Sequence, residues 1–185
     1  MIALRLRDAV EHGLARSTVE GKVRDGSWVK VARGVYAPAA VEAADLDWVE
    51  AATRRPDGTV CLVSALATYG LSDQIPTALD VAIPRPARIP ASEGAISWHL
   101  FNAASYDIGR EPITIPGTDI RSWIYCPERC IVDAVRLRGR LGYETGIDAL
   151  KSWLNAGGRP ADLMRVAGQV PRATSAIHAA LQVLA

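Results

Sequence analysis

The sequence keeps its strand-like segments apart from most of its helix-like segments, and this order restricts the fold class more than any other feature. After Pro76, short β-branched and aromatic runs bounded by Pro, Gly or Asn predict strands over 78–83, 95–101, 113–115 and 120–125. Ahead of them, an apolar run over 60–69 predicts a helix that ends at Gly70. From Pro127 onward, helical spacing predicts helices over 128–138, 144–155, 161–169 and 174–184. Segregated strands and helices predict an α+β fold with a mixed or antiparallel sheet and a helical C-terminal half.

The N-terminal segment has a different pattern. Residues 4–11 predict a short helix, and Ser17–Glu20 fits a capping box that opens a second helix over 18–25, with Gly26 as its stop. Two β-rich runs then flank Arg33-Gly34, which predicts a hairpin. Two short helices followed by a hairpin are typical of a winged helix-turn-helix that lacks the usual first helix.

These patterns predict three segments. Residues 1–40 form the winged helix-turn-helix, 41–56 a linking helix centred on 45–52, and 57–185 a C-terminal α+β domain. The net charges of 1–36, 37–120 and 121–185 are +3, −6 and +4, within a total of +1. A basic N-terminal segment is what a nucleic-acid-binding module on a more neutral body would carry, although surface charge can also be uneven by chance.

A winged module predicts specific DNA contacts. The helix over 18–25 would be the recognition helix, with double-stranded DNA facing its outer side and its N-terminus. Lys30 and Arg33 on the wing would contact the backbone or the minor groove. We expect Glu20 and Asp25 to oppose phosphate, and Trp28 and Tyr36 to pack in the core. The predicted DNA-binding residues are Arg16, Ser17, Thr18, Gly21, Lys22, Lys30 and Arg33.

The basic residues also allow other interpretations. Lys22 and Arg24 could be a solvated helix face, and such modules also bind proteins. In the C-terminal half, most of the arginines fit a solvated face, but Arg136, Arg138 and Arg140 could form a second anionic contact, either with DNA or with an acidic protein surface.

The residues do not predict an enzyme, a cofactor or a metal site. Glu20-Gly21-Lys22 has the Glu-x-Lys order of metal-dependent nucleases but lies in a predicted helix, and Asp45-Leu46-Asp47 lacks the Gly-Ser turn of a nucleotidyltransferase. Cys126 and Cys130 are four residues apart, but two ligands do not make a zinc site. Asp133, an acid among apolar neighbours, is expected to form an internal salt bridge with Arg121, Arg129 or Arg136.

The cellular setting follows from cysteine content and hydropathy. Three cysteines are an odd and sparse set, which favours a reducing compartment, and Cys130 is expected to be buried as a small apolar residue. The charged N-terminus and the absence of any apolar run of membrane-spanning length predict a cytoplasmic protein without a membrane segment.

Several motifs together resemble one known family. The N-terminal ones are Gly13–Val19, Val23–Val31 and Arg33–Tyr36, and the C-terminal ones are Ser64–Leu71, Leu79–Pro84, Asp119–Arg121 and Pro127–Ala134. Over nearly the whole chain they resemble the AbiEi family of type IV antitoxins, winged helix-turn-helix regulators from bacteria. Only the missing first helix departs from the family pattern.

The resemblance implies a transcriptional repressor that binds repeats in the promoter of its own operon. It also implies a cognate toxin, a nucleotidyltransferase-like protein of the AbiEii type. In much of the family the antitoxin opposes the toxin without a stable complex, while some relatives bind theirs directly. The alternative for this chain is a protein-interaction module that neutralises the toxin by direct binding, with a vestigial winged domain.

Overall fold

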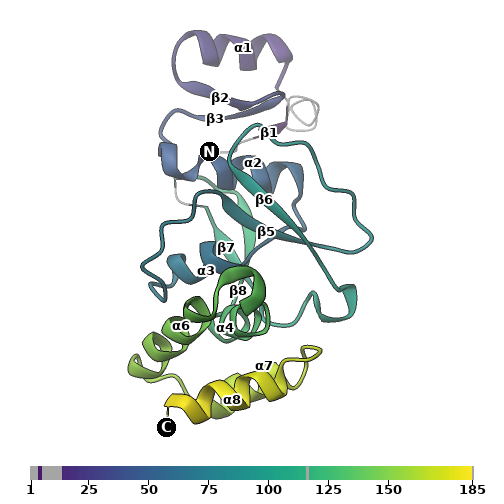
Figure 1. Cartoon of the computed structure of the whole chain (residues 1–185). Helices are drawn as coiled ribbons and strands as arrows, with labels where there is room; N and C mark the ends of the chain where they lie inside the picture. The colour runs from purple at the N-terminus through teal and green to yellow at the C-terminus, as the bar shows by residue number, and fades with distance from the viewer. Residues whose placement is uncertain (1–3, 6–13, 116, 185) are drawn as a thin grey trace.

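The structure, a computed structural model, describes residues 4–5, 14–115 and 117–184. Along the long axis of the molecule, a small N-terminal helix and hairpin lie at one end, a five-stranded sheet lies in the middle, and a group of helices lies at the other end (Figure 1). The observed architecture is α+β with a mixed sheet and a helical C-terminal half, as the segregated sequence pattern predicts.

The N-terminal module comprises strand β1 (Leu4–Arg5), helix α1 (Arg16–Arg24), and strands β2 (Trp28–Ala32) and β3 (Val35–Pro38). The strands form an antiparallel sheet in the order β1-β3-β2. The hairpin prediction is confirmed, because Gly34 takes the positive φ of +74° that the tight turn requires. The predicted helix over 4–11 is wrong at residues 4 and 5, which pair with β3, and its remainder lies outside the described residues.

Helix α1 begins two residues earlier than predicted, and the predicted capping box is wrong. Ala15 is the N-cap, and its carbonyl accepts from the amides of Thr18 and Val19 at 2.9 and 3.2 Å. Glu20 does not reach back to the Ser17 amide, since its carboxylate accepts from Arg16 Nε at 2.8 Å. The predicted stop is confirmed, because Gly26 follows the helix with a φ of +79°.

Helix α2 (Leu46–Arg54), preceded by a 3-10 turn (Ala43–Asp45), is the helix expected between the two halves. It packs against the hairpin as well as the sheet region. Val49 and Ala52 share one buried cluster with Val35 of β3 and Ile115 of the C-terminal half. The helix therefore joins the two parts through a common apolar core.

The central sheet has the order β6-β5-β4-β8-β7. Its strands are β4 (Thr59–Val60), β5 (Leu79–Pro84), β6 (Ile96–Phe101), β7 (Arg110–Thr114) and β8 (Arg121–Tyr125). β5–β6 and β4–β8 are parallel, whereas β4–β5 and β7–β8 are antiparallel. Four of these strands match the predicted ones. Residue 60, predicted to open a helix, instead lies in the short strand β4 at the centre of the sheet.

The remaining helices pack around α4 (Pro127–Arg136), which contacts α3, α6, α7 and α8. Their bounds are α3 (Leu62–Thr68), α5 (Arg138–Leu141), α6 (Tyr143–Asn155), α7 (Pro160–Ala167) and α8 (Thr174–Leu184). α4 and α6 cross closely at Gly146, where an added Cβ would lie 2.9 Å from Val135 atoms. The apolar spacing that predicted helices here thus corresponds to one continuous core.

Candidate nucleic-acid interface

Helix α1 and the hairpin are held together by a small apolar cluster. Val19 of α1 and Trp28 of β2 are both buried, and Leu14, Val23 and Tyr36 pack around them. Trp28 and Tyr36 are therefore packing residues, as expected. The opposite side of the helix and the tip of the hairpin are left exposed, and most of the predicted contact residues lie on these two surfaces.

The predicted residues of α1 do not all lie on the exposed side. Ser17 and Thr18 are exposed, whereas Lys22 is half-buried, with its Nζ 5.7 Å from the centroid of the Trp28 ring. Helical geometry, with 100° per residue from buried Val19, instead places Gly21 and Arg24 near the middle of the outer face. Arg24 is exposed and is a candidate contact that was not among the predicted DNA-binding residues. The spacing of Val19 and Val23 could have indicated it, because these two residues define the buried face of the helix.

The charges on this surface are only lightly paired. Arg16 forms a surface ion pair with Glu20, with side chains 74% and 48% exposed, so this pair contributes little stability. Asp25 accepts from the Ser27 amide at 2.9 Å, and hydrogen bonds from Ser27 lower the pKa of its carboxyl. Within the described part of the chain, no carboxylate pairs with the side chain of Arg24.

The hairpin adds two exposed cations, Lys30 in the middle of β2 and Arg33 at the tip. The tip is tied to the body, because the Arg33 amide donates to Glu93 Oε1 at 2.8 Å. Glu93 lies in the loop between β5 and β6, and the backbone of this loop is fixed by Glu50 of α2. The fully buried Glu50 carboxylate accepts from the amides of Glu93 and Gly94 at 2.9 and 2.7 Å. Arg54 Nε donates to Glu50 Oε1 at 2.5 Å and balances its charge. The side chains of Glu50 and Glu93 thus connect the tip of the hairpin to α2.

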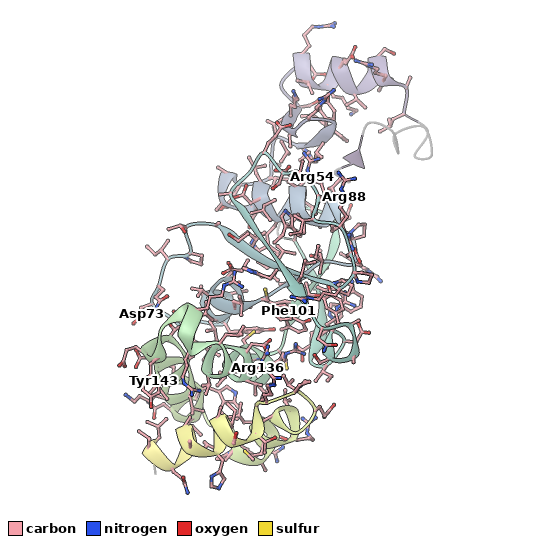
Figure 2. All side chains as sticks on the ribbon, turned by 45° about the vertical axis from the view of Figure 1, so that its right-hand side comes forward. Arg54, Asp73, Arg88, Phe101, Arg136 and Tyr143 are labelled. Carbon is pink, nitrogen blue, oxygen red and sulfur yellow. The ribbon has the colours of Figure 1, made fainter. Side chains whose placement is uncertain are left out.

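The second predicted contact, formed by Arg136, Arg138 and Arg140, lies far from α1. Figure 2 shows Arg136 and Phe101 between the sheet and the C-terminal helices, while Arg54 and Arg88 lie toward the N-terminal module. Arg136 lines two neighbouring cavities, one together with Arg140 and the other together with Arg138. The structure therefore does not bring Arg138 and Arg140 into one cavity.

Asp133 takes the structural role that the sequence predicted. Its carboxylate accepts from Arg129 Nε at 2.8 Å and from Arg136 Nη2 at 2.7 Å. Arg129 is 1% exposed, and its Nη1 also donates to the carbonyls of Ser105 and Ile108. Arg121, the third predicted partner, is exposed on β8 and does not take part. This network joins α4 to the segment that follows β6.

The fold is similar to a solved structure. The RV2827C protein from Mycobacterium tuberculosis superposes with a TM-score of 0.60 at 20% sequence identity, covering 98% of this chain and 72% of that chain. At this identity the similarity concerns the fold alone. No protein-family model matches the sequence. A comparison with curated proteins finds no match either, so the resemblance to AbiEi stays a prediction.

The cysteines lie in apolar surroundings rather than in a site. All three are buried, and Cys130 packs as the small apolar residue that was expected, with its Sγ 3.2 Å from the Tyr125 carbonyl oxygen. Burial raises the pKa of the Cys61 and Cys130 thiols well above the usual value, and that of Cys126 to about 11. At neutral pH the thiols are therefore protonated, a poor state for nucleophiles or metal ligands.

No three His, Cys, Asp or Glu side chains among residues 4–5, 14–115 and 117–184 are grouped so as to hold a metal ion. In the same part of the chain, every helix is too short or too polar to cross a bilayer.

Proposed function

We propose that the chain is the antitoxin of a bacterial type IV toxin–antitoxin system, which represses its own operon by binding promoter DNA and counteracts a nucleotidyltransferase-type toxin of the AbiEii kind. The N-terminal module would be a winged helix-turn-helix, with α1 as the recognition helix and β2–β3 as the wing. The role requires no catalytic residue and no cofactor. The resemblance of the sequence to AbiEi supplies the biological context.

The observation that carries the DNA-binding part is the group of cations on α1 and the hairpin, which outnumber the carboxylates of Glu20, Asp25 and Glu93 beside them. Arg24, Lys30 and Arg33 are all exposed, and none has a carboxylate partner for its side chain in the described part of the chain. The strand order β1-β3-β2, with α1 preceding the hairpin, also suits a winged module. In a winged module, the recognition helix enters a DNA groove while cations on the helix and the wing contact backbone phosphates.

The decisive experiment is a fluorescence-anisotropy titration with the DNA upstream of the gene, run across a salt series beside a scrambled duplex. We expect sequence-selective binding that weakens as salt rises, because each phosphate contact releases counterions. Arg24→Ala and Arg33→Ala should each weaken binding and reduce the slope of log K against log salt by about 1.

Two further variants make this test specific. Lys151→Ala removes an exposed cation from α6, at the other end of the molecule, and should bind DNA as the parent does. Lys22→Ala should have a smaller effect on the salt slope than Arg24→Ala, because the ammonium of Lys22 lies over Trp28. If Arg24→Ala and Arg33→Ala bind like the parent, the assignment of this surface is wrong.

A second candidate function is supported by a groove at the opposite end of the molecule. Tyr143 and Val183 are 50% and 67% exposed beside a cavity of about 670 Å³ between α4, α6 and α8. Exposed apolar side chains around a cavity favour a protein contact. In this alternative the chain neutralises the toxin by direct binding, and the winged module is vestigial. Co-purification with the product of the neighbouring gene tests it, and failure of Tyr143→Ser to reduce retention would count against this groove.

A further inference from the structure

A cavity of about 710 Å³ opens between the end of β6, helices α4 and α5, and the loop that joins α7 to α8. Six basic side chains line it: Arg85, His99, Arg129, Arg136, Arg140 and Arg172. No Asp or Glu of the described residues is in the lining. Five arginines around one cavity repel each other unless carboxylates or a bound anion balance their charge.

Carboxylates behind the lining balance only part of this charge. Asp133 pairs with Arg129 and Arg136, and Asp80 lies behind His99. In the described part of the chain, no carboxylate pairs with Arg85, Arg140 or Arg172. Three guanidinium charges in or beside one cavity therefore remain unbalanced.

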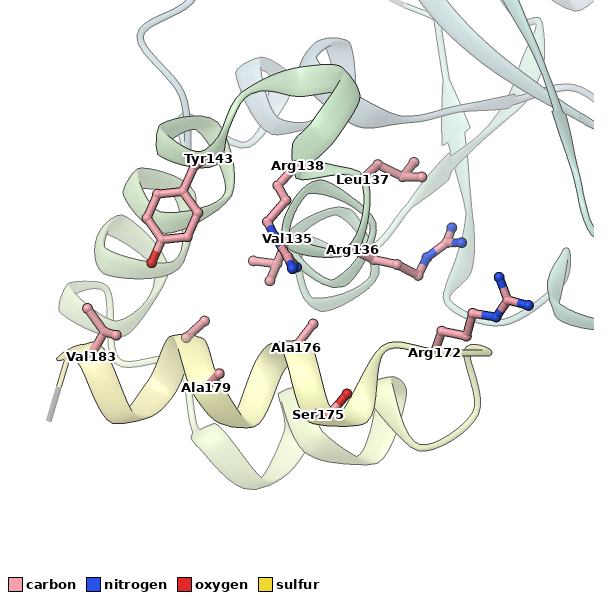
Figure 3. A pocket seen from close by; sticks show the side chains of 11 residues that line it. Val135, Arg136, Leu137, Arg138, Tyr143, Arg172, Ser175, Ala176, Ala179 and Val183 are labelled. Carbon is pink, nitrogen blue, oxygen red and sulfur yellow. The ribbon is translucent and has the colours of Figure 1, made fainter.

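The arrangement of Arg136 and Arg172 also favours a bound anion. Both residues also line the neighbouring cavity of about 670 Å³ that Figure 3 draws, and there their guanidinium groups extend toward the same side, Arg136 from α4 and Arg172 from the loop before α8. Arg136 Nη2 donates to Asp133, but its Nε is buried without a hydrogen-bond partner among the described residues. A buried N–H without an acceptor is energetically unfavourable. A ligand oxygen between the two guanidinium groups would remove like-charge repulsion and could supply an acceptor.

Arg140 is held by a chain of hydrogen bonds through His99 of β6 to Asp80 of β5. Its Nη2 lies 2.8 Å from His99 Nδ1, and His99 Nε2 lies 2.7 Å from Asp80 Oδ1. Since a guanidinium can only donate, Nδ1 must accept, which leaves the His99 proton on Nε2 to be donated to Asp80. Ser64 Oγ accepts from the Asp80 amide at 2.8 Å and further fixes β5. This chain of hydrogen bonds orients Arg140 before any ligand arrives.

We propose that this cavity binds a small molecule that carries phosphate groups, held by Arg85, Arg136, Arg140 and Arg172. Arginines held by a protein scaffold are suited to phosphate, since the planar fork of N–H donors matches two phosphate oxygens. The volume lies in the range of small-molecule pockets. Helix α4 and the α7–α8 segment, which contribute to the cavity lining, lie toward the end of the molecule opposite α1 (Figure 1), so this inference does not depend on the proposed DNA site.

The test is calorimetric titration of the full chain with inorganic pyrophosphate and, separately, with adenosine diphosphate. We expect saturable binding of at least one of them. The double variant Arg85→Gln/Arg172→Gln should weaken it at least tenfold, because it removes two exposed guanidinium groups that no described carboxylate balances. Both side chains are exposed, so the variant should fold, which circular dichroism and thermal unfolding would verify.

The matched control is Lys151→Gln, which removes one exposed charge from α6 outside the lining of this cavity. It should bind the phosphate ligands within twofold of the parent. Equal weakening by Lys151→Gln and by Arg172→Gln alone would overturn the proposal, because it would indicate general surface attraction. Absence of saturable binding of both ligands would overturn it as well.

A competition experiment separates a small ligand from a DNA phosphate. Protein saturated with pyrophosphate should bind an upstream duplex with unchanged affinity, after correction for ionic strength. Displacement of pyrophosphate by the duplex would instead make the cavity part of a DNA contact and overturn the small-ligand proposal.

Discussion

The two cationic surfaces of the molecule differ in what lies behind their charges. On the N-terminal module, Arg24, Lys30 and Arg33 extend from a thin layer with a very small core of its own. In the C-terminal cavity, Arg136 and Arg140 are held by Asp133 and His99, which belong to buried hydrogen-bond networks. In the described part of the chain, the side chains of Arg24, Lys30 and Arg33 have no carboxylate partner, whereas Arg136 and Arg140 are each held by a hydrogen bond to a buried side chain.

This difference indicates different ligands. Long, free cations adapt to an extended polymer whose phosphates recur along its length, and they give affinity that depends strongly on salt. Cations fixed beforehand lose less entropy on binding and select a ligand of matching shape. Under the two proposals, the exposed cations of the N-terminal module would bind DNA, and the cavity would bind a small anion.

The largest expected effect is at Asp133, whose charge is buried between two arginines. Asp133→Asn leaves Arg129, 1% exposed, without its counter-charge, and we expect the free energy of unfolding to fall by about 3–5 kcal/mol. Asp148→Asn is the matched control, because its pair with Lys151 is 3.8 Å long and exposed and should contribute about 0–1 kcal/mol. Urea unfolding measures both. A loss below about 1 kcal/mol for Asp133→Asn would contradict the buried network.

The next largest loss of stability is expected at Glu50, which connects the β5–β6 loop, and through it the β2–β3 hairpin, to α2. Glu50→Gln replaces a charged acceptor of two amides and Arg54, and we expect a loss of about 2–3 kcal/mol. Hydrogen exchange at the amides of Glu93 and Gly94 should also become faster. Glu42→Gln, an exposed position before the 3-10 turn, is the control and should change neither. Unchanged exchange in Glu50→Gln would mean that the loop is held by other contacts.

The elements of the C-terminal half were largely predictable, because apolar period and Pro or Gly boundaries are local signals. The failures are non-local. Residues 4–5 have a helix-like pattern but pair with β3, and Val60 belongs to an apolar run but forms a two-residue strand between β5 and β8. Partners distant in the sequence decide both cases, and no local pattern reports them.

The candidate sites were predictable only in part. Three arginines were predicted as alternative partners of Asp133, and the two that lie on the same helix, Arg129 and Arg136, are the ones that pair with it. Helical spacing within α1 could have shown that Arg24 is more exposed than Lys22. The arginine-lined cavity of about 710 Å³ could not be predicted from the sequence, because Arg85, His99 and Arg172 come from segments far apart in the sequence. Their convergence depends on how α4 and the α7–α8 loop pack against β6.

The smallest expected effect is at Gly21, and it separates stability from DNA binding on the N-terminal module. An added Cβ there would meet nothing within 4 Å, so Gly21→Ala should raise the free energy of unfolding by about 0.8–1.0 kcal/mol, since alanine favours the helix. If the backbone of α1 approaches DNA closely at this position, the same variant should weaken duplex binding. Gly139→Ala, also with open space around it but on α5, controls for a glycine replacement far from DNA. The Gly21→Ala protein could instead be more stable and bind the duplex as tightly as the parent. This result would place the DNA contact at the N-terminus of α1 and on the hairpin rather than at the middle of the helix.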